Sequence, residues 1–244
     1  MERHRRNWEE LAAVDPLWAV LSVRGLRGRW QLDGFLATGD ADVAALLEIC
    51  AEVARPKRRE RVLDFGCGVG RLARPFAREF AEYVGVDVAE GMVNHARELH
   101  ADLQNCTFVL GGDLGAFADA SFDLVFANLV LQHLPSRPAV ERSVLELLRV
   151  VRRDGLLVFQ LPSRLAPTRR LQPRRRVYAL LRRLGLTPPF LQRRLGLHPI
   201  RVLAIPEADV RALLERRGAT VERVLAEEVA GVSSRRYYVT AAPR

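Results

Sequence analysis

The sequence predicts an α/β fold in which helices cover both faces of a doubly wound, mostly parallel sheet. Short apolar runs alternate with segments of helical periodicity between residues 61 and 161, and this βαβ alternation favours a parallel sheet with right-handed crossovers. A glycine-rich turn, Gly66-Cys67-Gly68-Val69-Gly70, follows the first apolar run. Residues 220–228 and 236–242 are predicted to form a closing hairpin.

The N-terminal segment is predicted to be helical. Residues 5–22 form two short helices broken at Asp15 and Pro16, which suit an N-cap and a first helical position. Asp40 is predicted to cap a further helix that ends near Ala54.

Large aromatic residues give this N-terminal segment most of its bulk: Trp8, Trp18, Trp30 and Phe35. They either pack the helices onto the sheet or belong to a cover over a ligand pocket, which residues 30–39 would close. Both interpretations stay open at the sequence level.

The central elements follow from hydrophobic periodicity. The predicted strands are 61–65, 82–87, 107–111, 122–127 and 156–161, and the predicted helices are 71–80, 90–101, 138–152 and 206–218, with a turn at 153–155. In such sheets ligands bind at the carboxyl ends of the strands. Gly66, Asp87, Asp113 and Asn128 all fall at these ends.

The glycine turn has the features of a nucleotide-type site. Glycine permits positive φ and lets a ligand approach the backbone closely, and the next helix directs free N–H groups towards that ligand. A dinucleotide fingerprint would place a third glycine where this chain has Arg71, and here Asp64 lies inside the strand end. Both departures disfavour NAD.

The run Leu63-Asp64-Phe65-Gly66-Cys67-Gly68-Val69-Gly70 resembles motif I of the class I S-adenosylmethionine-dependent methyltransferases. Later segments agree in order and spacing: 83–87, 108–114, 122–128 and 153–161, with looser agreement from Ile205 to Ala242. The resemblance implies a Rossmann-like, seven-stranded sheet with an antiparallel last strand.

The resemblance also implies S-adenosylmethionine as cofactor and S-adenosylhomocysteine as product. Asp87 would hold the ribose, Met92 would pack on the adenine, and Asp113 would face the adenine amino group. The expected cofactor-binding set is Asp64, Gly66, Cys67, Gly68, Gly70, Asp87, Val88, Met92, Gly112, Asp113, Leu114 and Asn128.

His133 is the one candidate catalytic residue. It resembles the histidine that many small-molecule methyltransferases carry after the fourth strand, where some use it as a base, and an imidazole suits that role at neutral pH. The alternative is a histidine that caps or packs the following turn. No cluster of residues has the spacing of a metal site.

Length and composition limit the number of domains, the membrane relationship and the cysteine chemistry that we expect. A chain of 244 residues with 49% hydrophobic residues fits a single domain, and no apolar run is long enough to cross a bilayer. The polar start does not resemble a signal peptide, so we expect a cytoplasmic protein. The three cysteines are scattered and indicate neither disulfides nor a zinc site. Cys67 is expected to be a small residue that fits within the turn, not a nucleophile.

Positive charge is concentrated in residues 164–201, which contain eleven arginines and no acidic residue. The charge of this segment alone therefore exceeds the net charge of the whole chain, which is +9. Val177, Leu180, Leu181 and Leu184 repeat at helical spacing there, so an amphipathic basic helix is expected. It could face an anionic acceptor, an anionic membrane or RNA, or be a lid whose leucines face the core and whose arginines are solvated.

Several signatures are missing. No Pro-Pro-aromatic follows Asn128, a single lysine rules out the lysine-containing tetrad of ribose methyltransferases, and no cysteine follows the fourth strand. These absences leave methyl transfer to an O, N or S atom of a small, anionic or glycosylated metabolite. The alternatives are an RNA methyltransferase that uses residues 164–201, disfavoured by few aromatic residues, and a non-catalytic cofactor-binding or membrane-associated protein.

The expected organisation is one methyltransferase domain over residues 1–244. It comprises an N-terminal helical cap (1–54), a cofactor-binding core (61–161), an arginine-rich insert (162–205), and a C-terminal helix and hairpin (206–244). Peripheral contact with an anionic membrane stays open, as does the oligomeric state.

Overall fold

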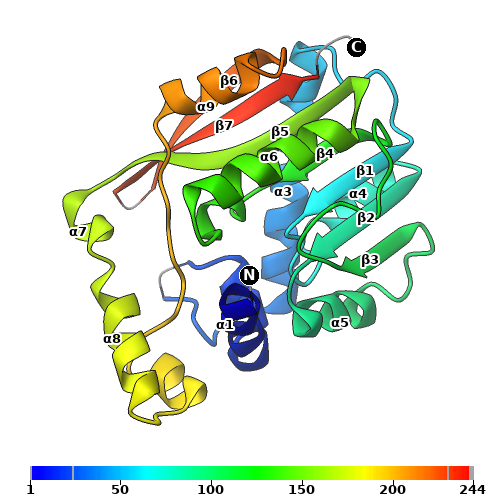
Figure 1. The fold of residues 1–244 in the computed structure, drawn as a ribbon. Helices are drawn as coiled ribbons and strands as arrows, with labels where there is room; N and C mark the ends of the chain where they lie inside the picture. The colour runs from blue at the N-terminus through cyan, green and yellow to red at the C-terminus, as the bar shows by residue number, and fades with distance from the viewer. Residues whose placement is uncertain (1, 24, 230, 242–244) are drawn as a thin grey trace.

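A seven-stranded sheet with helices on both faces dominates the structure (Figure 1). The computed structural model describes residues 2–23, 25–229 and 231–241. Its strands are β1 (Arg61–Phe65), β2 (Glu82–Asp87), β3 (Cys106–Leu110), β4 (Phe122–Ala127), β5 (Val151–Leu165), β6 (Thr220–Val229) and β7 (Val232–Thr240). Its α-helices are α1 (Glu2–Val14), α2 (Pro16–Val20), α3 (Leu32–Glu52), α4 (Ala73–Glu79), α5 (Glu90–Leu99), α6 (Arg137–Val150), α7 (Pro167–Arg170), α8 (Pro173–Arg183) and α9 (Glu207–Glu215). A short 3-10 helix, η1 (Leu131–His133), and a short π-helix, η2 (Phe190–Arg194), complete the helical elements that the structure describes.

The strand order is β3-β2-β1-β4-β5-β7-β6. The pairs among β1 to β5 are parallel, and β7 runs antiparallel to both β5 and β6. This confirms the predicted mostly parallel sheet with an antiparallel last strand. Ala242, the predicted end of that strand, lies outside the described residues.

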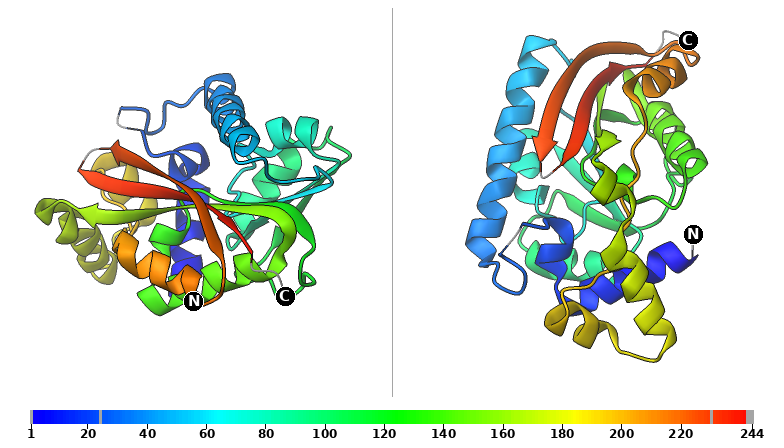
Figure 2. Two further views of the ribbon diagram at one scale, coloured as in Figure 1. Left: turned by 90° about the horizontal axis from the view of Figure 1, so that it is seen from above. Right: turned by 90° about the vertical axis from the view of Figure 1, so that its left-hand side faces the viewer.

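Two hydrophobic cores form on opposite faces of the sheet (Figure 2). On one face α6 and α9 pack through apolar residues such as Val144 and Leu214, and on the other α3, α4 and α5 pack through Leu46, Phe76 and Val93. A third, smaller cluster joins α1 and α2 to α3 and α5. The predicted N-terminal helical cap is therefore a packed part of the fold.

The predicted helix start at Asp40 is wrong, because α3 begins at Leu32 and contains Asp40. Gly39 sits where a Cβ would lie 2.2 Å from the carbonyl oxygen of Arg71, so this glycine allows α3 to approach the glycine-turn segment. The Asp40 carboxylate pairs with Arg78 at 3.0 Å instead of capping a helix. By contrast, the Asp15 cap is confirmed, since its carboxylate accepts a hydrogen bond from the N–H of Trp18 at 3.2 Å.

The predicted turn at 153–155 is also wrong, because β5 is continuous from Val151. Its pairing with β4 is irregular, with Val151 opposite Phe122 and Leu156 opposite Leu124. The extra residues bulge where Gly155 approaches the carbonyl oxygen of Asp123, from which an added Cβ would lie 2.5 Å away. Gly155, which suggests a turn in the sequence, lies instead in a β-bulge of β5.

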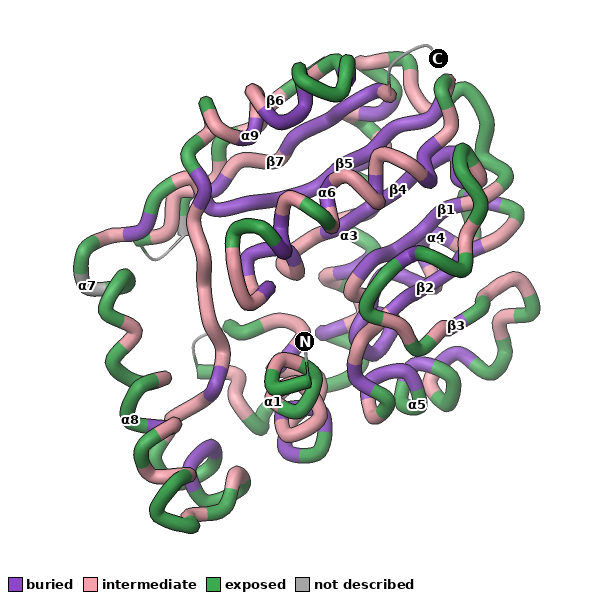
Figure 3. The backbone as a smooth tube through the Cα atoms, viewed as in Figure 1, coloured by how far each residue is buried: buried purple, intermediate pink, exposed green. Residues whose placement is uncertain are grey.

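Residues 167–195, containing α7, α8 and η2, project from the sheet as an arm beside α1 (Figures 1 and 3). The predicted basic helix is confirmed as α8. A lid whose leucines face the core is not, because Leu180 and Leu184 are 57% and 68% exposed. Among the described residues, no helix combines the length and apolar character needed to cross a membrane.

Candidate active site

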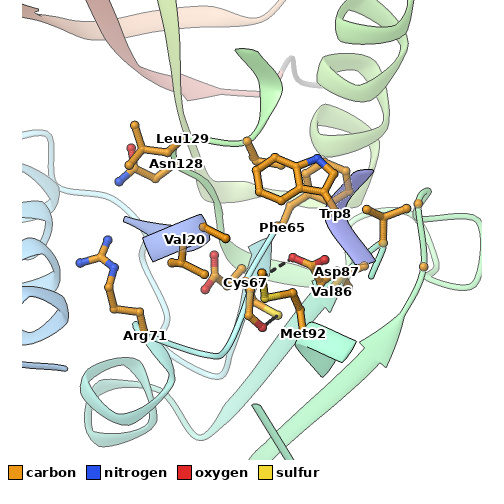
Figure 4. Close-up of a pocket in the computed structure, with 18 of the residues that line it drawn as sticks. Trp8, Val20, Phe65, Cys67, Arg71, Val86, Asp87, Met92, Asn128 and Leu129 are labelled. Carbon is orange, nitrogen blue, oxygen red and sulfur yellow. Dashed lines mark hydrogen bonds between the residues drawn. The ribbon is translucent and has the colours of Figure 1, made fainter. Parts of the chain in front are cut away.

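A cavity opens where β1, β2 and β4 end, as predicted for the ligand site of a parallel sheet (Figure 4). Most of the sequence-predicted cofactor residues line it: Asp64, Gly66, Cys67, Gly68, Asp87, Val88, Met92, Gly112 and Asn128. In the view of Figure 4, Arg71 and Asn128 lie towards one end of the cavity, and Asp87 and Met92 lie towards the other.

The glycine turn follows β1 directly and needs glycine for two reasons. Gly66, Gly68 and Gly70 have φ values of +80°, +55° and +77°, in the left-handed region that favours glycine. A Cβ on Gly66 would lie 2.4 Å from Cγ2 of Val130, and one on Gly68 would lie 2.3 Å from Cγ2 of Val20. The turn is therefore a glycine cradle in which the side chains of Val130 and Val20 pack directly on the backbone at the cavity wall.

Asp87 ends β2 and binds the same turn. Its Oδ2 accepts a hydrogen bond from the N–H of Gly68 at 2.9 Å, and its Oδ1 accepts one from the N–H of Ala89 at 2.9 Å. Burial raises the pKa of the Asp87 carboxyl, and the backbone N–H donors oppose that shift. A carboxylate has about four acceptor positions, so Asp87 can still accept a hydrogen bond from a ligand.

Asp64 is a second buried acid, at the end of β1. The hydroxyl of Tyr83 donates a hydrogen bond to its Oδ2 at 2.9 Å. Burial raises the pKa of Asp64 to about 7, although that hydrogen bond and the nearby Arg71 act in the opposite direction. This carboxyl is poised to ionise when a cation binds beside it.

Arg71 contributes a buried cation that sequence reasoning treated only as a missing glycine. Its guanidinium donates to Oδ2 of Asp42 at 2.8 Å and to Oγ1 of Thr38 at 3.1 Å. Its Nε is buried without a partner among the described residues. Because this side chain lines the cavity, it can offer an N–H to an anionic group there.

Asn128 follows β4 and also carries an unused polar atom. Its side-chain Oδ1 is buried and finds no partner among the described residues. The next residue, Leu129, has a φ of +57°, a sparsely populated conformation for a residue with a side chain. A buried acceptor beside a strained backbone at the cavity wall is a feature typical of a ligand site.

Three predicted cofactor residues lie elsewhere. Asp113 and Leu114 line an adjoining cavity that shares Phe65, Val88, Gly112 and Leu134 with the first. Gly70 lies beneath the turn, where an added Cβ would be 2.8 Å from the ring of His100. Gly70 shapes the turn from below.

His133 does not line either cavity. Its ring packs on Trp8 with centroids 5.3 Å apart, and its Nδ1 lies 2.5 Å from the carbonyl oxygen of Arg201. Because a carbonyl only accepts, Nδ1 carries the proton, and Nε2 accepts from the amide of Gln132 at 3.2 Å. Burial lowers the pKa of His133 to about 4. This geometry favours the packing interpretation over the base.

Helices α1 and α2 cover the cavity and supply its residues His4, Trp8, Ala19 and Val20. Residues 30–39, the other predicted cover, line neither cavity. The α1 cover is attached to the core by Glu9, whose carboxylate accepts hydrogen bonds from the N–H groups of Glu90 and Gly91 at 2.6 and 3.1 Å. Helical periodicity places α1, but no sequence signal shows which of its residues face the cavity.

The arginine-rich insert contributes no lining residue to either cavity. It packs on the outer side of the cover, where Tyr178 and Arg182 donate to the carboxylate of Glu10 at 2.6 and 2.9 Å. In the part of the chain that the structure describes, no group of His, Cys, Asp and Glu side chains could hold a metal ion.

Part of the chain is similar to known methyltransferases. A family model described as a methyltransferase domain matches residues 63–159. A malonyl-[acyl-carrier protein] O-methyltransferase of Erwinia pyrifoliae is 40% identical over 110 residues, which are 44% of this chain and 39% of that protein. A ubiquinone biosynthesis O-methyltransferase of Neisseria meningitidis is 38% identical over 108 residues, 42% of this chain and 44% of that protein. The chain thus spans less than half the length of these relatives.

A solved structure has the same fold over the whole chain. The magnesium protoporphyrin IX methyltransferase from Synechocystis PCC 6803, with bound SAH, superposes with a TM-score of 0.64 and covers 99% of both chains at 22% identity. Residues 63–159 therefore match a methyltransferase domain, and the chain as a whole has the fold of that solved methyltransferase.

Proposed function

We propose that this chain is an S-adenosylmethionine-dependent methyltransferase that acts on a small, anionic or glycosylated acceptor. The observation that carries the proposal is the Asp87 carboxylate bound to Gly68 within a glycine cradle at the carboxyl end of the sheet. That arrangement offers a fixed carboxylate beside a closely approachable backbone to a nucleoside, and it lies within the matched methyltransferase domain.

The residues present fit the cofactor. Asp87 can accept a hydrogen bond from the ribose, and Met92, 1% exposed, offers an apolar surface to the adenine. We assign the adenine edge to Asp113 and Leu114, which line the adjoining cavity. The bound cofactor would supply an electrophilic methyl group on a sulfonium.

Charged groups suit the amino-acid end of the cofactor. Arg71 has an unpartnered Nε–H for a carboxylate, and Asp64 can ionise beside an ammonium group. Asn128 lies at the same end of the cavity in Figure 4, with a buried oxygen available to accept a hydrogen bond. Together these residues would orient the reacting end rather than take part in bond formation.

The remaining task of the protein is to exclude water and align the acceptor, since in-line methyl transfer needs little other chemistry. Trp8, Ala19 and Val20 provide an apolar cover over the cradle. The proposed domain organisation follows: a core that binds the cofactor, an α1–α2 cap that closes it, and an insert that packs on the cap.

An anionic acceptor is supported by the charge at the α1 side of the cavity. Burial lowers the pKa of His4 to about 4, and the positive charge of Arg201 contributes in the same direction. The pKa of Arg175 is lowered by burial first and then by the positive charges of Arg201 and Arg3, so several cations lie near one another here. Because an ionised oxygen needs no base, a carboxylate acceptor would react without one.

Oxygen is the acceptor atom we favour. Two curated relatives are named as O-methyltransferases, and a third relative, 32% identical over 136 residues, is a trans-aconitate 2-methyltransferase from Azoarcus. The names of the first and third of these relatives specify malonyl and aconitate groups, which carry carboxylates. The role of His133 as a base stays a prediction from resemblance.

The decisive experiment is calorimetric titration with S-adenosylmethionine and S-adenosylhomocysteine, followed by incubation with a panel of carboxylates, phenols, glycosides and a short RNA. Mass spectrometry would detect a gain of one methyl group. Cofactor binding with methylation of a carboxylate or glycoside is expected. Lack of binding to both cofactor forms would refute the proposal, and methylation of RNA alone would overturn the acceptor class.

A further inference from the structure

The apolar side of helix α8 faces solvent instead of the protein core. Val177, Leu180 and Leu184 form an apolar stripe that is 44%, 57% and 68% exposed. The side that packs on α1 instead carries Tyr178, which is 3% exposed, and Arg182, paired with Glu10. A surface helix normally buries its apolar stripe, so this one is arranged for a second contact.

The exposure is specific to the arm of residues 167–195. Nine large hydrophobic side chains are exposed among the described residues, and six belong to this arm: Leu171, Val177, Leu180, Leu184, Phe190 and Leu195. The arm stands away from the sheet in two views, with α7 and α8 mostly exposed in Figure 3. Exposed apolar side chains that cluster in one segment indicate an interaction surface, whereas single exposed leucines scattered over a protein do not.

Arginines border the apolar stripe. With 3.6 residues per turn, Arg174 falls on one side of the stripe, and Arg176 and Arg183 fall on the other. All three are exposed, and none forms an ion pair with another described residue. No acidic residue occurs from 164 to 201, so nothing within the segment neutralises these charges.

We propose that this arm docks on an anionic membrane surface, with the apolar stripe of Val177, Leu180 and Leu184 in the headgroup boundary and the flanking arginines on lipid phosphates. Exposed apolar side chains bordered by cations are the pattern of an interfacial helix, and each basic residue near an anionic surface adds attraction. RNA fits less well, because Tyr178 is buried and Phe190 is the arm's one exposed aromatic residue among those described.

Docking would bring the active site to the lipid. The arm is bonded to α1 through Glu10, and α1 supplies His4 and Trp8 to the cavity wall. A membrane-borne acceptor with an anionic or hydroxyl group is then the substrate class that this geometry suits. This last step rests on the proposed function, whereas docking itself does not.

The test measures flotation of the full chain with vesicles of phosphatidylcholine alone or with about one-third phosphatidylglycerol. We expect binding to the anionic vesicles at low salt, at least about 10-fold weaker binding to the neutral ones, and a decrease with added salt. Failure to bind anionic vesicles at low salt would overturn the proposal, as would binding that the two lipid compositions support equally.

Paired variants separate the two contributions. Leu180→Ser with Leu184→Ser should weaken vesicle binding at least about 10-fold, whereas Leu32→Ser, an exposed leucine on α3, should not. Arg176→Gln with Arg183→Gln should weaken it about 10-fold, and Arg216→Gln with Arg217→Gln, exposed beyond α9, should not. Arm variants that bind vesicles like the unmodified chain would overturn the assignment.

S-adenosylhomocysteine affinity is measured on the same samples and should be equal in all variants, which shows that each is folded. If the chain binds vesicles but no cofactor, the proposed function fails and docking stands. If the cofactor binds but the arm captures only RNA or an acidic protein and no vesicle, docking fails and the proposed function stands.

Discussion

The carboxylate of Asp87 accepts a hydrogen bond from the backbone N–H of Gly68 at 2.9 Å, so one acid joins the end of β2 to the glycine turn after β1. The same carboxylate accepts from Ala89 at the start of the next helix. Because these contacts fix its orientation, Asp87 can present its remaining acceptor positions to a ligand without first being ordered.

Replacing Asp87 with alanine should therefore weaken cofactor binding by about 10²-fold, since hydrogen bonds to a charged group are worth roughly 1.5–3 kcal/mol each. Calorimetric titration with S-adenosylhomocysteine measures the change. Asp102→Ala is the matched control, because that acid is exposed and pairs with Arg74. Unchanged affinity in Asp87→Ala would contradict the assigned site.

Arg71 is predicted to hold the carboxylate of the cofactor. Arg71→Gln should weaken S-adenosylhomocysteine binding by about 10-fold or more, since a charge-assisted hydrogen bond is lost. It should hardly change the affinity for 5′-methylthioadenosine, which lacks the amino-acid part. Arg74→Gln, three residues on with an exposed partner, serves as control. Equal losses for both ligands would show that Arg71 acts only on the structure of the turn.

The strands and the glycine turn could be predicted because local signals determine them. β1, β2 and β4 match their predicted ranges, since buried parallel strands are short apolar runs bounded by glycine and acid. Asp87 falls at a strand end for the same reason. Features that depend on contacts distant in sequence were missed: Gly39 against Arg71, and Gly155 against Asp123.

The helix α8 of the arginine-rich insert could be predicted from the sequence, but the direction that its apolar side faces could not. Hydrophobic periodicity indicates a helix, yet it does not show whether the apolar side of α8 meets protein or solvent, and the leucines there are exposed. Similarly, the sequence places His133 after β4, but only the structure shows that its two ring nitrogens are occupied by the Arg201 carbonyl and the Gln132 amide. Orientation is set by tertiary contacts.

Cofactor affinity should rise with pH between about pH 6 and 8. The pKa of Asp64 is raised to about 7, so below that value the carboxyl is mostly protonated and cannot balance an ammonium group. Below pH 7, each unit should lower the affinity for S-adenosylmethionine by up to about 10-fold. Titration calorimetry at several pH values checks this. In Asp64→Asn the dependence should disappear, and its persistence there would assign the titration to another group.

His133 provides a test of catalysis. His133→Gln should leave cofactor affinity unchanged and kcat within a few-fold, because the ring lies outside the cavity and an ionised acceptor needs no base. A loss of about 10²-fold in kcat at unchanged affinity would instead establish the base that the family resemblance implies. His4→Gln, in the cavity wall, should mainly raise the acceptor KM.

His133 should also make the fold sensitive to acid. Its pKa is lowered to about 4 by burial, whereas the unfolded chain binds the proton near 6.5, so between these values the unfolded state holds more protons. The stability contribution is complete above pH 6.5, falls as pH decreases towards 4, and is lost below. His133→Gln should reduce the difference in unfolding free energy between about pH 7 and pH 4.5 by roughly 1–3 kcal/mol, measured by urea unfolding. The exposed His95→Gln should keep the full difference, and an equally steep decline in His133→Gln would place the acid sensitivity elsewhere.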